Sequence, residues 1–190
     1  MIKDCTILGI DPGTNLLGFG VVSVSGGKPH YVDMGVFDLR KISDPFEKLA
    51  NINAGVEELI AVHKPDHLAV ESPFYGKNAQ VILKLGRAQG AAIIAAAKAG
   101  VSVTEYAPRR AKIAICGNGA ASKEQVAMMV EKTLGIDIDP GHLDATDALA
   151  IAMCHYYQLT NPLGGTKIAN SWEKFLKDNP DRINSGISRK

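Results

Sequence analysis

Short apolar runs alternate with longer stretches of helical periodicity along this chain. Residues 5–10 form a buried-type apolar run that ends at the turn sequence Asp-Pro-Gly, residues 11–13. Segments 18–25 and 30–39 are β-branched or alternate between apolar and polar residues, and the glycine pair 26–27 separates them. The pattern therefore predicts a strand followed by a β-hairpin.

Helical spacing of apolar residues predominates further along the chain. Asp44 suits the N-cap and Pro45 the first turn of a helix over residues 44–63. Residues 67–72 and 101–107 are short apolar segments that predict two more strands. The remaining predicted helices cover residues 78–99, 108–116, 122–134 and 142–158. Three strands followed by alternating helices and strands predict an α/β fold, in which a five-stranded mixed sheet is flanked by helices on both faces.

The length of 190 residues fits one domain with a tail. We expect the domain to cover residues 1–160 and residues 161–190 to form a flexible tail, because Asn, Pro, Gly, Ser and Lys are frequent there. There is no run of about 18 apolar residues and no signal-peptide pattern. Three widely spaced cysteines without a CxxC motif disfavour a disulfide framework. These features are typical of a cytoplasmic protein with no membrane association.

Charge is unevenly distributed although the formal net charge is only +1. Residues 75–123 contain eight basic side chains and one acidic side chain, a net charge of +7. Residues 1–74 have a net charge of −4 and residues 124–160 of −5, so the basic segment lies between two acidic ones. This separation suits a protein that binds a polyanion close to a cation site, although an unevenly charged, solvated surface would show the same pattern.

Four carboxylates lie within or at the end of apolar runs, where an unpaired charge is costly. They are Asp11, Glu71, Asp144 and Asp147. Taken singly, each has an ordinary structural explanation: a turn cap, a strand-end residue, or acidic residues at the N-terminal end of a helix. Together they suggest a shared site for a hard divalent cation such as Mg²⁺, which prefers oxygen ligands. Asp144 and Asp147 are three residues apart, so a helix would place both on one face.

Six motifs along the chain are individually distinctive. They are ILGIDPGTNLLGFGVV, AVESPF followed by KNA, LKLGRAQG, EYAPRRAK, GNGAASKEQV and DATDALAIAMCH. In this order the motifs resemble the RuvC-type Holliday junction resolvases, over roughly residues 6–157. The resemblance implies an RNase H-like fold and a bacterial homodimer that cuts two opposing strands of a four-way DNA junction, in recombination and DNA repair. It also implies a branch-migration complex of the RuvAB type as a partner.

The same resemblance implies a role for each matched residue. The four carboxylates would hold two Mg²⁺ ions, replaceable by Mn²⁺, about 3.5–4 Å apart, so that one activates water and the other stabilises the leaving 3′ oxygen. Lys112 and Lys123 match lysines near the scissile phosphate. His142, two residues before Asp144, could assist the site, but a helix-capping or surface role is the simpler interpretation. The residues expected to contact DNA are Phe74, Lys77, Arg109 and Arg110.

Three alternatives remain open on the sequence alone. IDPGTNLLGFGV also resembles the phosphate-binding turn of actin-like kinases and ATPases, but those proteins need two such domains. A non-catalytic junction-binding or RNA-processing module on the same fold would be expected to lack some of the carboxylates. A small metabolic phosphohydrolase would not need the basic segment 75–123. The sequence therefore favours a metal-dependent nuclease.

Overall fold

The computed structural model describes residues 3–73, 78–138 and 143–160. Within these ranges the chain forms five strands and five helices. The strands are β1 (Cys5–Asp11), β2 (Leu16–Ser25), β3 (Lys28–Asp38), β4 (His67–Glu71) and β5 (Ser102–Tyr106). The helices are α1 (Pro45–His63), α2 (Ala79–Lys98), α3 (Pro108–Cys116), α4 (Lys123–Leu134) and α5 (Leu143–Thr160).

The five strands form one mixed sheet in the order β3-β2-β1-β4-β5. Strand β2 is antiparallel to both β1 and β3, whereas β4 is parallel to both β1 and β5. Asp11 on β1 lies opposite Gly18 on β2, and Ile10 lies beside Val70 on β4. The mixed sheet predicted from the sequence is confirmed, and it places β1 and β4 side by side at its centre.

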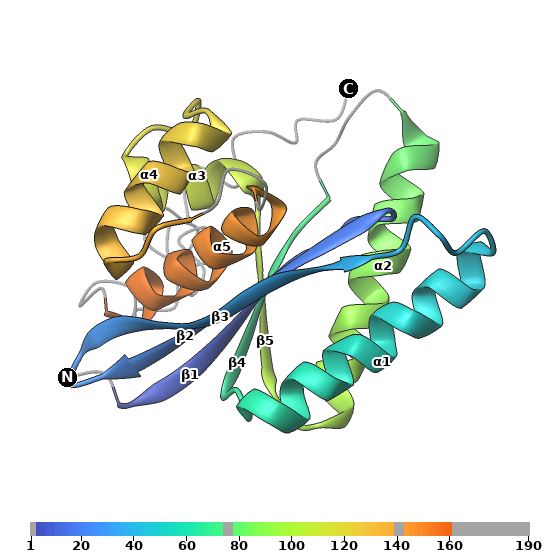
Figure 1. Ribbon diagram of the computed structural model, residues 1–190, viewed down its shortest axis with the longest axis horizontal. Coiled ribbons are helices and arrows are strands. Elements are labelled where there is room, and N and C mark those ends of the chain that lie inside the picture. Colours follow the sequence, from blue (N-terminus) through green and yellow to red (C-terminus); the bar gives the residue numbers. More distant parts are fainter. Residues whose placement is uncertain (1–2, 74–77, 139–142, 161–190) are drawn as a thin grey trace, which may run out of the picture.

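Helices α1 and α2 cover one face of this sheet (Figure 1). Alternate residues of the central strands, such as Leu8, Ile10 and Val70, point toward these helices and are fully buried. On the helix side, small residues of α2 such as Ala88 and Ala92 let the helix approach the strands closely. The predicted N-cap of α1 is confirmed, because the side chain of Asp44 accepts hydrogen bonds from two first-turn amides.

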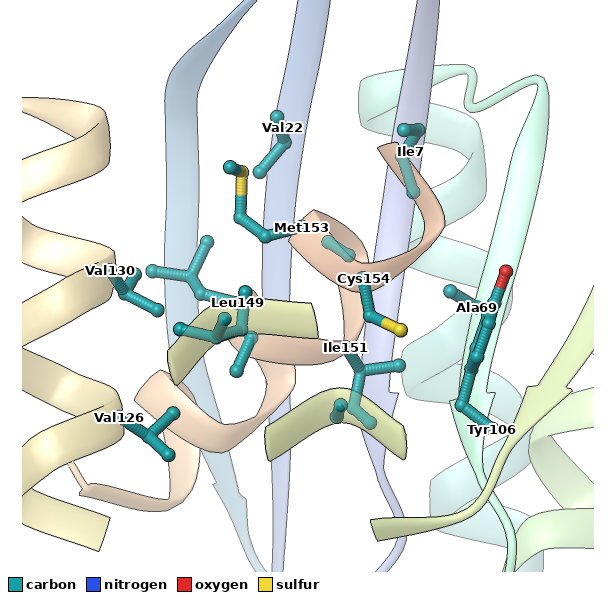
Figure 2. Close-up of a cluster of buried hydrophobic side chains, with 14 of the residues drawn as sticks. Ile7, Val22, Ala69, Tyr106, Val126, Val130, Leu149, Ile151, Met153 and Cys154 are labelled. Carbon is teal, nitrogen blue, oxygen red and sulfur yellow. The ribbon is translucent and has the colours of Figure 1, made fainter. Parts of the chain in front are cut away.

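Helices α3, α4 and α5 cover the opposite face (Figure 1). Figure 2 shows Leu149, Ile151 and Met153 of α5 in one apolar cluster with residues of the sheet and with Val126 of α4. The capping box predicted for α4 is present, since the Ser122 and Gln125 side chains each bond the other's backbone amide. Helices on both faces therefore confirm the predicted layer architecture.

Three glycines bring α5 into direct contact with the sheet. A Cβ atom built on Gly9 would lie 2.1 Å from the carbonyl oxygen of Ala148, and one on Gly18 would lie 2.1 Å from that of Asp144. A Cβ atom on Gly20 would lie 2.7 Å from the backbone nitrogen of Leu149. Because Gly9 pairs with Gly20 across β1 and β2, the helix backbone rests on a surface without side chains.

Among the described residues, none of the helices has the combination of length and apolar character that a membrane span requires. The predicted tail, residues 161–190, lies outside the described residues.

We predict that Gly18→Ala destabilises the protein because the new methyl group has no room beside α5. Overpacking of this kind costs about 1–3 kcal/mol in the free energy of unfolding. Gly86→Ala in α2 is the matched control, because a Cβ atom there meets nothing within 4 Å. The control should be stabilised by roughly 0.5–1 kcal/mol through helix propensity. Urea unfolding at one protein concentration measures both changes, and equal effects of the two substitutions would contradict the close approach.

Candidate active site

Two carboxylates of the site come from the ends of adjacent parallel strands. Asp11 is the last residue of β1 and Glu71 the last residue of β4. The pairing of Gly9 with Ala69 and of Ile10 with Val70 places both carboxylates one residue further, at the same edge of the sheet. Side chains alternate along a strand, so Asp11 and Glu71 share the face of Gly9 and Ala69, which is the face that α5 covers.

Helix α5 contributes the other two carboxylates. Its first turns lie over Gly18, which pairs with Asp11, and this brings Asp144 and Asp147 to the end of β1. One carboxylate oxygen from each of Asp11, Asp144 and Asp147 lies within 4.8 Å of the others. Of the four carboxylates predicted to converge, three therefore meet in this cluster, and Glu71 lines the cavity beside it.

A cavity of about 370 Å³ opens beside this cluster. We call it the acidic cavity. Its walls come from the ends of β1 and β4 and from helices α2 to α5. The polar and charged side chains that line it are Asp11, Glu71, Lys112, Lys123 and Asp147. Five of the six residues predicted to be catalytic therefore face one space, and the sixth, Asp144, adjoins it through the carboxylate cluster.

Burial makes ionisation of two of these carboxyl groups costly. It raises the pKa of Asp11 to about 7, and the nearby charges of Asp147 and Asp144 add to this effect. Burial likewise raises the pKa of Glu71 to about 8, helped by the charges of Asp11 and Asp147. Without a cation in the cavity, these side chains are thus partly protonated near neutral pH. Perturbation of this kind is common at functional sites.

Lys123 is the cation that contacts the cluster directly. Its Nζ atom lies 2.5 Å from Oδ2 of Asp147 and 3.4 Å from Oδ1 of Asp144. Burial alone would lower the pKa of Lys123, but the hydrogen bond and charge of Asp147 outweigh it and raise that pKa. Lys123 begins α4, so the capping box of this helix fixes the origin of its side chain. One ammonium group offsets only part of the charge of four carboxylates.

Lys112 reaches the cavity from α3 but is held differently. Its Nζ atom donates a hydrogen bond of 2.7 Å to the carbonyl oxygen of Ala121. This bond ties α3 to the segment that precedes α4. The charge of Lys112 acts on Glu71, whose pKa it lowers slightly against the larger effect of burial.

Gln89 is a residue of the site that sequence reasoning missed. It lies on α2 with only 8% of its surface exposed, and its Nε2 atom donates to the backbone oxygen of Glu71 at 3.3 Å and to Oε2 of Glu105 at 2.8 Å. It thereby links α2 to the ends of β4 and β5. The signal available in the sequence was one polar residue on the otherwise alanine-rich buried face of this helix.

The residues predicted to bind DNA lie outside the acidic cavity or outside the described residues. Arg110 donates to Oε1 of Gln158 at 2.7 Å, and its guanidinium carbon lies 5.5 Å from the centroid of the Tyr106 ring. Arg109 and Arg110 are both exposed on α3, where they are accessible to a backbone phosphate. Three further residues named from the sequence lie outside the described residues: Phe74, Lys77 and His142.

The donor set fits a divalent cation. All the clustered ligands are carboxylate oxygens, which hard cations prefer. Burial, together with repulsion from neighbouring carboxylates, raises the pKa values of Asp11 and Glu71, and a bound cation would offset that repulsion. The residues able to hold the ion are Asp11, Asp144 and Asp147, with Glu71 at the end of the neighbouring strand.

Comparison with known proteins gives one consistent result. The family model "Crossover junction endodeoxyribonuclease RuvC" matches residues 7–155. A protein of that name from Bacteroides fragilis is 47% identical over 184 residues, which are 96% of this chain and 97% of the relative.

Solved structures agree in fold. RuvC from Thermus thermophilus in complex with a Holliday junction substrate superposes with a TM-score of 0.71 at 36% identity, over 80% of this chain and 94% of that one. The yeast mitochondrial Holliday junction resolvase has a TM-score of 0.58 at 15% identity, over 90% and 83% of the two chains, and shows a likeness of fold alone. The predicted RNase H-like fold is confirmed.

We predict that the metal-free protein loses stability as the pH rises. The pKa values of Asp11 and Glu71 are raised on folding from about 4 in an unfolded chain. Their contribution to stability is therefore complete below about pH 4 and is lost as the pH rises through about 7 and about 8.

The neutral variant Glu71→Gln should escape its share of this loss. In chelator at pH 9 it should be more stable than the unchanged protein by on the order of a few kcal/mol, whereas at about pH 4 the two should be nearly equal. The exposed Glu58→Gln is the control. A Glu71→Gln effect that urea unfolding finds independent of pH would contradict the assigned protonation.

Proposed function

This chain belongs to the RuvC family of crossover junction endodeoxyribonucleases, and from that membership we propose that it resolves Holliday junctions by nicking two opposing DNA strands. The observation that carries the proposal is the cluster of Asp11, Asp144 and Asp147 beside a cavity that Lys112 and Lys123 line. A structure-selective nuclease needs such a set of groups to stabilise charge on a phosphate. The family model over residues 7–155 favours this assignment over the actin-like alternative.

We propose Mg²⁺ as the metal, with two ions per active site and Mn²⁺ as a substitute, held by Asp11, Glu71, Asp144 and Asp147. When bound, such ions supply Lewis-acid stabilisation of phosphoryl oxygens and lower the pKa of water. The chain's own contribution is to hold the carboxylates ready on two strand ends and one helix, so that little rearrangement is needed when substrate arrives. Each of these elements is anchored in the core.

The two lysines would stabilise the negative charge that grows on the scissile phosphate. Lys123 lies beside Asp144 and Asp147, where it offsets part of the negative charge of the site in the absence of substrate. Lys112 is fixed by Ala121 on another wall of the same cavity, so the two ammonium groups approach a phosphate from different elements. Cationic groups that are already in position before the reaction stabilise the transition state without any rearrangement of the protein during the reaction.

The remaining assignments follow from family membership. We propose that Arg109, Arg110, Lys77 and Phe74 contact DNA, the arginines through the backbone. We further propose a homodimer, because two opposing strands must be cut, and a RuvAB-type branch-migration complex as partner in the bacterial cytoplasm. The nuclease domain is assigned to residues 1–160, and the family match to residues 7–155 supports this boundary.

Asp11→Asn should abolish cutting while leaving junction binding intact. The substitution preserves shape but removes a charge that the cation needs, and loss of one such group typically lowers rates by roughly 10²–10³-fold or more. Asp137→Asn, on an exposed residue outside the cavity, is the matched control. Purified proteins would be compared on a synthetic four-way junction with Mg²⁺, in parallel with a gel-shift assay. Undiminished cutting by Asp11→Asn would rule out this assignment of the site.

Lys112→Ala and Lys123→Ala should each slow the single-turnover cutting of saturating junction by roughly 10²–10³-fold. The exposed Lys132→Ala should cut at the unchanged rate. Arginine at either position should restore part of the activity, because the charge returns in a different shape. If alanine at both positions left the rate unchanged, the lysines would have only a structural role.

A further inference from the structure

A second cavity, of about 430 Å³, also borders α2. We call it the basic cavity. Its walls are the turn between β1 and β2, the start of α1, and one side of α2, which meet at one end of the sheet (Figure 1). It lies outside every assignment made above.

The charged side chains that line the basic cavity are all cationic. They are Lys48 of α1 and Lys84 and Arg87 of α2. Asp44 and Glu47 belong to the same first turn of α1, but neither lines the cavity, and Asp44 is engaged by backbone amides. Three cations around one hollow repel one another, and a bound anion would relieve that repulsion.

The three cations are not equivalent. Lys48 donates to the carbonyl oxygen of Thr14 at 3.0 Å and to Oδ1 of Asn15 at 3.1 Å, so it also holds the turn in place. Lys84 and Arg87 are exposed, and within the described ranges neither has a hydrogen-bond or ion-pair partner in the structure. These two side chains are therefore available to a ligand.

The two cavities share two walls. At the end of β1, Asp11 and the following Pro12 line the acidic cavity, whereas Thr14 and Asn15 of the turn line the basic cavity. Helix α2 contributes Leu85 to the acidic cavity, and it contributes Lys84 and Arg87 to the basic cavity. If a DNA strand places a phosphate at Asp11, the basic cavity therefore lies close to that strand, separated from Asp11 only by the turn between β1 and β2.

We infer that the basic cavity grips the backbone of the cut strand, at a phosphate beside the scissile one. This inference rests on the proposed function and adds a binding site to it. Phe46, at the rim, keeps 69% of its surface exposed, which suits contact with the sugar of that strand. Charge and position together favour a continuous polyanion over a small free anion, because the cavity adjoins the site where the strand is cut.

The test compares the double variant Lys84→Ala/Arg87→Ala with Lys28→Ala/Lys132→Ala, which removes two exposed charges elsewhere. Lys48 stays unchanged because it supports the turn. Binding of a synthetic four-way junction is measured in chelator across a salt series. The first variant should lose roughly ten- to sixty-fold in affinity at about 0.1 M salt, and its salt slope should fall by about 1–2, as expected for two lost phosphate contacts. The control should change less than about threefold.

A second arm locates the contact. Junctions carrying one neutral methylphosphonate at successive positions around the cut should bind the unchanged protein more weakly at one or two positions. The affinity of the Lys84→Ala/Arg87→Ala variant should not change when a methylphosphonate stands at those positions, because the variant lacks the cations that would contact the phosphate there. Equal behaviour of the two double variants would overturn the inference, as would a loss of affinity that couples to no single phosphate. If the unchanged protein cut no junction, the proposed function itself would fail, which is a separate result.

Discussion

The close approach of α5 to the sheet is the constraint on which the site depends. Gly9, Gly18 and Gly20 leave no side chain between the helix and strands β1 and β2, so backbone meets backbone. Only at this distance does the first part of α5 reach the end of β1, where Asp144 and Asp147 join Asp11. A single methyl group on the sheet at these positions would lift the helix and separate the carboxylates. The apolar packing shown in Figure 2 then holds the helix against the sheet.

This arrangement concentrates negative charge where the fold tolerates it poorly. Asp11 and Glu71 are buried deeply enough for their pKa values to rise toward and above neutrality, and Lys123 supplies only one compensating charge. The rest of the molecule offsets this cost through two apolar layers, one on each face of the sheet. A site that is electrostatically unfavourable when empty is one that binds a divalent cation well, because binding removes the repulsion. The same imbalance thus limits stability and supports function.

Sequence reasoning recovered what depends on local pattern. Strand and helix periodicity, the Asp44 cap and the capping box at Ser122 are local features, and the structure has all of them. The four carboxylates were identified because a charge beside an apolar run is conspicuous. What could not be predicted depends on packing between distant segments. Gln89 meets Glu71 only because α2 crosses the end of β4, and the basic cavity combines side chains from α1, α2 and a turn. The spacing of residues within a single segment cannot predict such contacts between distant segments.

The turn between β1 and β2 connects the catalytic chemistry to the position of the substrate. Two hydrogen bonds hold this turn: Lys48 donates to the carbonyl oxygen of Thr14, and the amide of Leu39 donates to the carbonyl oxygen of Asn15 at 2.8 Å. The turn is also tight, because a Cβ atom on Gly13 would lie 1.8 Å from the carbonyl oxygen of Leu16. A metal ligand precedes this turn and the basic cavity follows it. If both cavities hold one strand, the spacing between the gripped and the cut phosphate is set by four residues of fixed backbone. Placement of the cut relative to the gripped phosphate would then be a property of the fold.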